Sequence, residues 1–142
     1  MSAQSPVSPM PVISPEQRTR LIDAARLARE RAYAPYSHYT VGAALLTANG
    51  AIVTGGNVEN SAYPATICAE RSAVVKAISD GVRDFIAVAV YTSDGAWPCG
   101  TCRQVLNEFA PHIQVIVADA AGNIYQEPLD ALLPHGFILK TT

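Results

Sequence analysis

The sequence predicts an α/β protein, built as a three-layer α/β/α sandwich around a mixed five-stranded sheet. Three observations support this prediction. Segments with helical periodicity alternate with short apolar segments along the chain. Two of the helical segments stand between strands as crossover connections, which makes the strands that they link parallel. Two polar turns join consecutive strands directly, which adds antiparallel pairs and makes the sheet mixed.

The first half of the chain predicts a helix, a hairpin and a second helix. Ser14 is a hydroxyl cap followed by a proline, and the helix that it begins continues at helical spacing until Pro35 stops it. Residues 39–47 and 51–57 are typical of two strands, and the Asn-Gly pair between them favours a tight hairpin turn. Residues 68–81 predict the first crossover helix, which ends at a glycine.

The second half continues the alternation. Residues 85–93 are apolar without polar alternation, which is typical of a strand buried on both faces. Residues 99–110 predict the second crossover helix, which the following proline ends. Two further strands are expected at 113–119 and 123–127, joined by a turn that contains glycine. A last helical turn is expected at 129–134.

Composition indicates one globular domain that acts on a small molecule. The 142 residues, 49% of them hydrophobic, suit a single domain with its own core. We expect residues 14–142 to form that domain and residues 1–13, rich in serine and proline, to form a flexible tail. A net charge of −2 without a Lys/Arg cluster argues against a nucleic-acid groove. No apolar run reaches the ~20 residues of a membrane span, and residues 1–14 lack the basic and apolar regions typical of a signal peptide, so a cytoplasmic protein without a membrane partner is expected.

The chain has three cysteines, Cys68, Cys99 and Cys102, at the starts of the two crossover helices. If these helices flank adjacent parallel strands, their N-termini meet at one edge of the sheet. In a reducing compartment such thiols are typical of metal ligands. Structural zinc sites have four protein ligands, whereas catalytic sites have three and leave one position open. Three cysteines therefore favour one catalytic Zn²⁺ per chain over a redox pair or a cysteine that only fills the core.

Glu70 is the candidate catalytic residue beside Cys68. On a regular helix, side chains two residues apart diverge by about 200°. The two can share one site if Cys68 is the extended cap residue and Glu70 lies in the first turn. An acidic residue there is also common because it interacts favourably with the helix dipole. Its place beside a metal ligand favours general acid/base catalysis.

The motif segments form a known pattern. Cys-Ala-Glu at 68–70, followed by Pro-Cys-x-x-Cys at 98–102, is the signature of zinc-dependent deaminases. With cysteine as the first ligand, the chain resembles the cytidine deaminase family. The segments that carry the resemblance are 33–46, 55–74, 98–109 and 132–137.

The resemblance implies hydrolytic deamination of cytidine and 2'-deoxycytidine to the uridines, with release of ammonia. At the matching position, Glu70 takes a proton from the attacking water and delivers protons to the ring and to the departing amine. Arg71 matches a residue that donates hydrogen bonds to a ligand sulfur. By spacing alone, Arg71 could equally be an exposed helix arginine.

The resemblance also implies how the sugar is bound. Asn57 and Glu59 alternate at a strand end, so both side chains are expected on one face. They match the residues that hold the ribose 3'-hydroxyl. Without the resemblance, a strand end followed by a polar turn would be the preferred interpretation.

Further residues match the base pocket and the subunit assembly. Backbone groups near Ala69 match contacts to the base. Tyr39 and Tyr63 match pocket aromatics, and Tyr39 stands where the family usually has phenylalanine. Phe137 matches a residue that completes the site of a neighbouring subunit, which implies a homotetramer.

Two other functions are compatible with the zinc motif. A deaminase of another aminopyrimidine nucleoside, of the blasticidin-S type, shares it, although the Asn57/Glu59 pair favours a free ribose. A non-enzymatic zinc-binding protein is the alternative from a different class, and Glu70 would have no purpose there.

Overall fold

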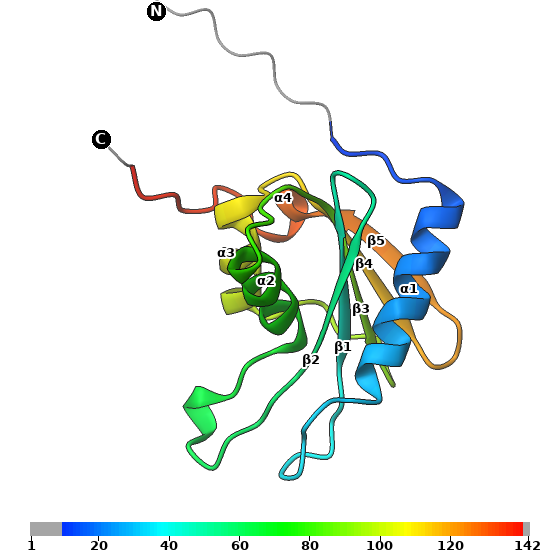
Figure 1. Ribbon diagram of the computed structural model, residues 1–142, viewed down its shortest axis with the longest axis vertical. Coiled ribbons are helices and arrows are strands. Elements are labelled where there is room, and N and C mark those ends of the chain that lie inside the picture. Colours follow the sequence, from blue (N-terminus) through cyan, green and yellow to red (C-terminus); the bar gives the residue numbers. More distant parts are fainter. Residues whose placement is uncertain (1–9, 141–142) are drawn as a thin grey trace, which may run out of the picture.

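The computed structural model describes residues 10–140, and its helices and strands follow the predicted order (Figure 1). The elements are α1 (Pro15–Arg29), β1 (Gly42–Thr47), β2 (Ile52–Gly56), the 3₁₀ turn η1 (Tyr63–Ala65), α2 (Ala69–Ser79), β3 (Phe85–Thr92), α3 (Gly100–Phe109), β4 (Gln114–Asp119), β5 (Ile124–Pro128) and α4 (Leu129–Leu132). Residues 1–9 of the expected tail lie outside the described residues, and residues 10–14 precede α1 without regular structure.

The five strands form one mixed sheet in the order β2-β1-β3-β4-β5. β3 and β4 are parallel, and the other neighbouring pairs are antiparallel. The strands that precede the two crossover helices are not adjacent, because β1 lies between β2 and β3 and runs in the opposite direction. β2 and β3 still point the same way, so α2 and α3 begin at the same edge of the sheet.

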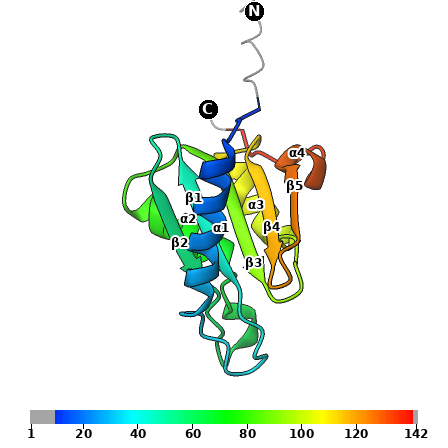
Figure 2. The same cartoon turned by 90° about the vertical axis from the view of Figure 1, so that its right-hand side faces the viewer.

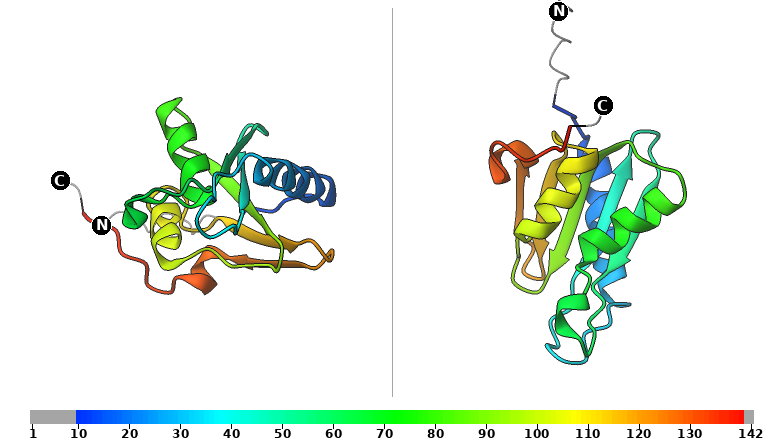
Figure 3. Two further views of the ribbon diagram at one scale, coloured as in Figure 1. Left: turned by 90° about the horizontal axis from the view of Figure 1, so that it is seen from below. Right: turned by 90° about the vertical axis from the view of Figure 1, so that its left-hand side faces the viewer.

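The helices cover both faces of the sheet and give it three layers. α1 packs against β1, β2 and β3 on one face, where Figure 2 shows it in front of the sheet. α2 and α3 lie side by side on the other face (Figure 3, right). This is the predicted α/β/α sandwich, and it leaves the carboxyl ends of β2 and β3 free to carry a site.

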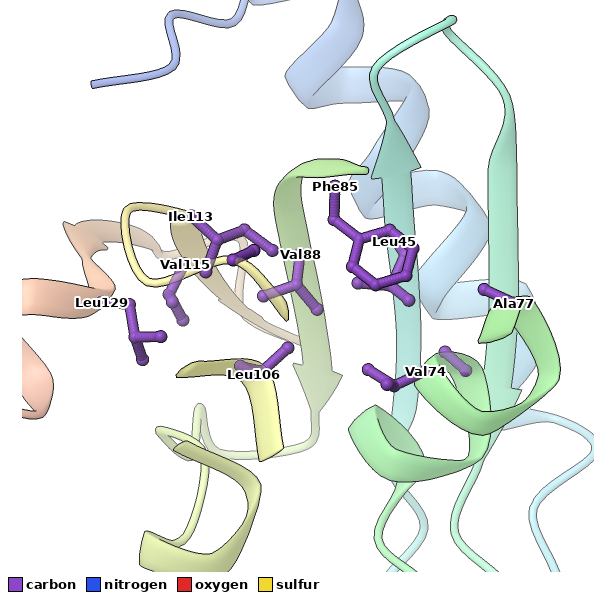
Figure 4. Packing of buried hydrophobic residues seen from close by; sticks show 11 residues of the cluster. Leu45, Val74, Ala77, Phe85, Val88, Leu106, Ile113, Val115 and Leu129 are labelled. Carbon is purple, nitrogen blue, oxygen red and sulfur yellow. The ribbon is translucent and has the colours of Figure 1, made fainter. Parts of the chain in front are cut away.

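Buried apolar side chains form one cluster on each face. Between the sheet and the α2/α3 layer, Leu45 and Val88 pack against Val74 and Leu106 (Figure 4). Between the sheet and α1, Leu21 belongs to a second cluster, which includes alanines of β1 and β3. β1 serves both clusters because its successive side chains point to opposite faces.

Two glycines allow the helices to approach the sheet closely. A Cβ at Gly42 would lie 1.9 Å from the carbonyl oxygen of Ala25 in α1. A Cβ at Gly55 would lie 2.5 Å from the Ala73 nitrogen and 2.8 Å from the Ala69 carbonyl oxygen in α2. The close packing at Gly55 therefore holds the first turn of α2 against β2.

α1 ends earlier than its sequence predicts. The predicted helix continues to Pro35, whereas α1 ends at Arg29 and is followed by i→i+3 backbone bonds through residue 32. The Tyr33 amide then donates to the Asn57 carbonyl, and the Tyr33 carbonyl accepts from the Glu59 amide. This pairing with a distant segment takes the place of further helical hydrogen bonds. The helical spacing of nearby residues cannot predict such a distant contact.

The segments after α1 and after β2 extend beyond the sheet together (Figure 1). Tyr33 pairs with Val58, and Val58 pairs with Ile67, which closes the second segment into a loop that leads to α2. Within residues 10–140, no helix is both long and apolar enough to cross a membrane.

Candidate metal centre and substrate pocket

The N-termini of α2 and α3 bring the three cysteines together. Cys68 is the N-cap of α2, with extended backbone angles (φ −68°, ψ 154°), and Glu70 lies in the first turn. Cys99 is the N-cap of α3, and its Sγ accepts from the Cys102 amide at 3.4 Å. The extended cap at Cys68 is the arrangement that two side chains only two residues apart need to share one site.

The geometry of the three sulfurs fits a zinc ion. All three Sγ atoms lie within 4.8 Å of one another, and those of Cys68 and Cys99 are 3.9 Å apart. Tetrahedral zinc with Zn–S bonds of about 2.3 Å places its sulfurs about 3.8 Å apart. None of the three cysteines is in a disulfide. Among the described residues, they are the only group of this kind that could hold a metal ion.

Arg71 lies in the first turn of α2 and contacts the sulfur cluster. Its Nη2 donates to Cys68 Sγ at 3.5 Å and to the Thr66 carbonyl oxygen at 3.3 Å. Hydrogen bonding from Cys102, and then from Arg71, lowers the pKa of the Cys68 thiol to about 5 despite partial burial. The hydrogen bond to Cys68, together with burial, raises the pKa of the Cys102 thiol. The lowered pKa favours a thiolate at Cys68 with the Arg71 cation beside it, and a thiolate is the form of cysteine that binds a metal cation.

Glu70 lies at the inner wall of a cavity of about 290 Å³ that also reaches Cys68 and Cys99. The glutamate is only 4% exposed. Burial raises the pKa of the Glu70 carboxyl to about 7. A carboxyl group of this kind can take up and release a proton near neutral pH.

Asn57 and Glu59 line the same cavity and are both buried, whereas Val58 between them is exposed. Glu59 accepts from the Ser37 hydroxyl and from the amides of Tyr36 and Ser37, at 2.9 and 3.1 Å. The hydroxyl bond from Ser37 lowers the pKa of the Glu59 carboxyl. Glu59 is therefore an ionised acceptor that points into the pocket.

The Asn57 side chain bridges the chain segment that precedes β1. Its Oδ1 accepts from the Val41 amide at 2.8 Å, and its Nδ2 donates to the Tyr39 carbonyl at 2.9 Å. The oxygen and the nitrogen of the Asn57 side chain thus both hold the backbone of residues 39–41 in place. The pocket wall on this side consists of loop residues that are held in place by a strand-end side chain.

Three of the other predicted pocket residues line the cavity, and one does not. Tyr39, Tyr63 and Ala69 all contribute to its wall. Phe137 lies outside it with its residue 66% exposed, and its carbonyl oxygen accepts from Gln104 at 2.7 Å. Within one chain, then, the pocket is built without Phe137.

Some pocket residues were not singled out from the sequence, among them Ser37, Thr92 and Trp97, and neither was Asp94, which contacts the pocket residue Tyr39. Ser37, Thr92 and Trp97 line the cavity, and Asp94 accepts from the Tyr39 hydroxyl at 2.6 Å. Trp97 could have been found, because it stands next to the Pro-Cys pair and is the only tryptophan. Asp94 gives no such signal, since Ser-Asp-Gly after a strand is typical of an ordinary turn.

Comparison with known proteins places this geometry in a family. Residues 15–118 match the model of the cytidine and deoxycytidylate deaminase zinc-binding region. A cytidine deaminase of Sporosarcina psychrophila is 49% identical over 83% of this chain and 89% of its own length, and one of Halalkalibacterium halodurans is 46% identical over 84% and 93%. The crystal structure of a cytidine deaminase from Burkholderia pseudomallei superposes with a TM-score of 0.82 at 43% identity, over 84% of this chain and 98% of that one. The chain therefore belongs to the cytidine and deoxycytidylate deaminase family with its zinc-binding region.

Proposed function

We propose that the protein is a zinc-dependent hydrolase that deaminates cytidine and 2'-deoxycytidine to uridine and 2'-deoxyuridine. The observation that carries this proposal is that one cavity joins three functions. It reaches two of the three clustered cysteines, the buried Glu70 carboxyl and the Asn57/Glu59 pair. The first two supply hydrolytic chemistry, and the last supplies hydrogen-bonding groups for a sugar.

Cys68, Cys99 and Cys102 would hold the zinc ion, with Arg71 offsetting part of the thiolate charge at Cys68. When bound, zinc supplies a Lewis acid that lowers the pKa of a water molecule at its open position. The two helix N-termini on which the cysteines sit add positive potential at the same place. Three thiolates alone would leave the site with a net negative charge, so these contributions matter for its strength as a Lewis acid.

Glu70 would move the protons of the reaction. It takes one proton from the attacking water, whose oxygen bonds to C4 of the ring, and gives this proton to N3. It then takes the second proton from the hydroxyl now on C4, which becomes the carbonyl oxygen of uridine, and gives it to the departing amine. The C4–N bond breaks, and ammonia leaves with the delivered proton. One carboxyl can serve each step because it is protonated by the first, and its buried position keeps bulk water from competing.

Glu59 and Asn57 would bind the ribose 3'-hydroxyl. Glu59 already accepts three hydrogen bonds from residues 36 and 37, so it is held in one orientation before a substrate arrives. A fixed acceptor at a distance from the metal centre sets where the ring stands above the sulfurs. This supports a nucleoside rather than a free base as the substrate.

The test is conversion of cytidine to uridine, followed as the loss of absorbance near the cytidine maximum, with zinc analysis of the same sample. Blasticidin S as a second substrate separates the related activity. A protein that binds zinc and converts neither would be a non-enzymatic zinc-binding protein, and the proposal would be wrong.

We further propose a homotetramer, a cytoplasmic location and a single catalytic domain over residues 14–142. The exposed Phe137 side chain supports assembly, because it is free to enter a neighbouring subunit's site. Reduced thiol ligands favour the cytoplasm, and the packing of all described helices on one sheet favours one domain. Light scattering that finds a fully active monomer at assay concentration would rule out the tetramer.

A further inference from the structure

Tyr39 is bound to three different parts of the pocket. Its amide donates to Ser37 Oγ at 3.0 Å, its carbonyl accepts from Asn57 Nδ2 at 2.9 Å, and its hydroxyl donates to Asp94 Oδ1 at 2.6 Å. The first two bonds tie its backbone to residues that contact or neighbour Glu59. The third ties its side chain to the turn after β3.

That turn leads directly to the metal centre. Thr92, at the end of β3, is buried, and its Oγ1 accepts from the amides of Gly95 and Ala96 at 2.7 and 3.1 Å. It also lies 3.4 Å from Asp94 Oδ1, to which it donates. The chain then continues through Trp97 and Pro98 to Cys99. Thr92 therefore shapes the turn, and Asp94 is the residue of the turn that reaches across to Tyr39.

We propose that Asp94 is a positioning residue, which holds the Tyr39 ring in the pocket wall and links the sugar side of the pocket to the loop that carries Cys99. The inference rests on the proposed nucleoside deaminase function. It names a residue outside the deaminase motifs that acts on the substrate only through Tyr39.

The bond also explains how the pocket wall accommodates the hydroxyl group of Tyr39. The hydroxyl is bound by Asp94, so the aromatic ring is the part of the side chain left to line the cavity. Without Asp94, the hydroxyl would need another partner, and the ring could turn to find one. Partial burial, and then the bond to Asp94, raise the pKa of the Tyr39 phenol, which keeps it a donor.

The expected effect is moderate because Asp94 is exposed and water can replace part of the bond. Asp94→Ala is expected to raise the KM for cytidine by about 3- to 10-fold, with kcat within about twofold and full zinc content. Asp94→Asn keeps an acceptor oxygen and is expected to stay within about twofold of the wild type. Asp84→Ala, which removes an exposed aspartate outside the pocket, is the matched control for the lost charge.

The decisive measurement is the same substitution in a Tyr39→Phe background. If Asp94 acts through the Tyr39 hydroxyl, Asp94→Ala has no further effect there, and the double variant equals the Tyr39→Phe single variant. Binding of the product uridine gives a readout independent of turnover, because Trp97 is the only tryptophan and lines the cavity, so its fluorescence reports occupancy.

The possible outcomes test the positioning role of Asp94 separately from the proposed deaminase function. Equal effects of Asp94→Ala with and without the Tyr39 hydroxyl, or an effect on melting temperature and zinc content rather than on uridine binding, would overturn the positioning role. An unchanged KM in Asp94→Ala would do the same while leaving an active deaminase. A wild-type protein that neither binds uridine nor deaminates cytidine would overturn the proposed function, and this inference with it.

Discussion

The two ends of the pocket are built in different ways. At the metal end, Cys68, Cys99 and Cys102 sit at or just inside two helix N-termini, so each functional group is placed by the first turn of its own helix, although the two turns are 31 residues apart in the chain. At the other end, where we propose that the sugar binds, Glu59 is bound by residues 36 and 37, and Asn57 holds residues 39–41. These partners are about twenty residues away and lie on loops that extend beyond the sheet.

This difference indicates that substitutions at the two ends of the pocket should have different effects on activity. The metal end is rigid because helix caps and the close packing at Gly55 fix it. The other end is held by hydrogen bonds between loops, from the side chains of Glu59 and Asn57 and from the backbone of Tyr33. Changes at the metal end should therefore remove chemistry outright, whereas changes at the sugar end should shift substrate binding in graded steps.

Cys102→Ala is expected to have the largest effect. Two thiols are too few for a tight zinc site, so zinc content and activity should both fall to background. Metal analysis and the cytidine assay measure this, and Thr101→Ala, an exposed neighbour on the same helix turn, is the control that should keep both. Full zinc content in the Cys102→Ala protein would show that the three-thiol site is wrong.

Glu70→Gln is expected to separate chemistry from metal binding. The amide cannot move protons, so turnover should fall by about 10²- to 10⁴-fold or more, while zinc content and melting temperature stay close to those of the wild type. Glu108→Gln, at an exposed glutamate of α3, is the matched control. Loss of zinc in Glu70→Gln would contradict a purely catalytic role.

Glu59→Gln is expected to reduce kcat/KM for cytidine by about 10- to 100-fold, because a buried charged acceptor for the 3'-hydroxyl is lost. Zinc content should not change. The same substitution should matter far less for 3'-deoxycytidine, which has no hydroxyl to bind. Equal losses for both substrates would mean that Glu59 only supports the loop at residues 36 and 37.

Ser37→Ala is expected to have the smallest effect, about 2- to 10-fold in kcat/KM, because Glu59 keeps its two backbone donors.

The Ser37 hydroxyl is the main cause of the lowered Glu59 pKa, so that pKa should rise toward its ordinary value in Ser37→Ala. A lowered native pKa stabilises the fold above the unfolded-state pKa, and this stabilisation is lost as pH falls through the native value. Ser37→Ala should therefore lose stability at higher pH on acidification than the wild type does. Carboxyl NMR titration of Glu59 checks the shift, and an unchanged pKa would contradict the assignment.

The sequence by itself determined the element order, the mixed sheet, the three cysteines as the group that could hold a metal ion, and the place of Glu70 in the first turn of α2. These features depend on contacts within a helix turn or on strand periodicity. Both can be predicted from the spacing of residues in the sequence. Ser14 with Gln17 at the start of α1 and Cys68 as the cap of α2 show this, since each needs only the next three residues to take its conformation.

The tertiary structure alone decided three further points. It placed β1 between β2 and β3, ended α1 at Arg29 through the pairing of Tyr33 with the segment after β2, and joined Ser37 to Glu59 and Asp94 to Tyr39. In each case the partner lies far along the chain. Such contacts form only when the sheet brings the loops together, and Ser37 and Asp94 have the same sequence signature as residues of any polar turn. Local spacing therefore predicts the chemistry at the helix caps, whereas the shape of the pocket around the substrate depends on how the loops pack in the folded chain.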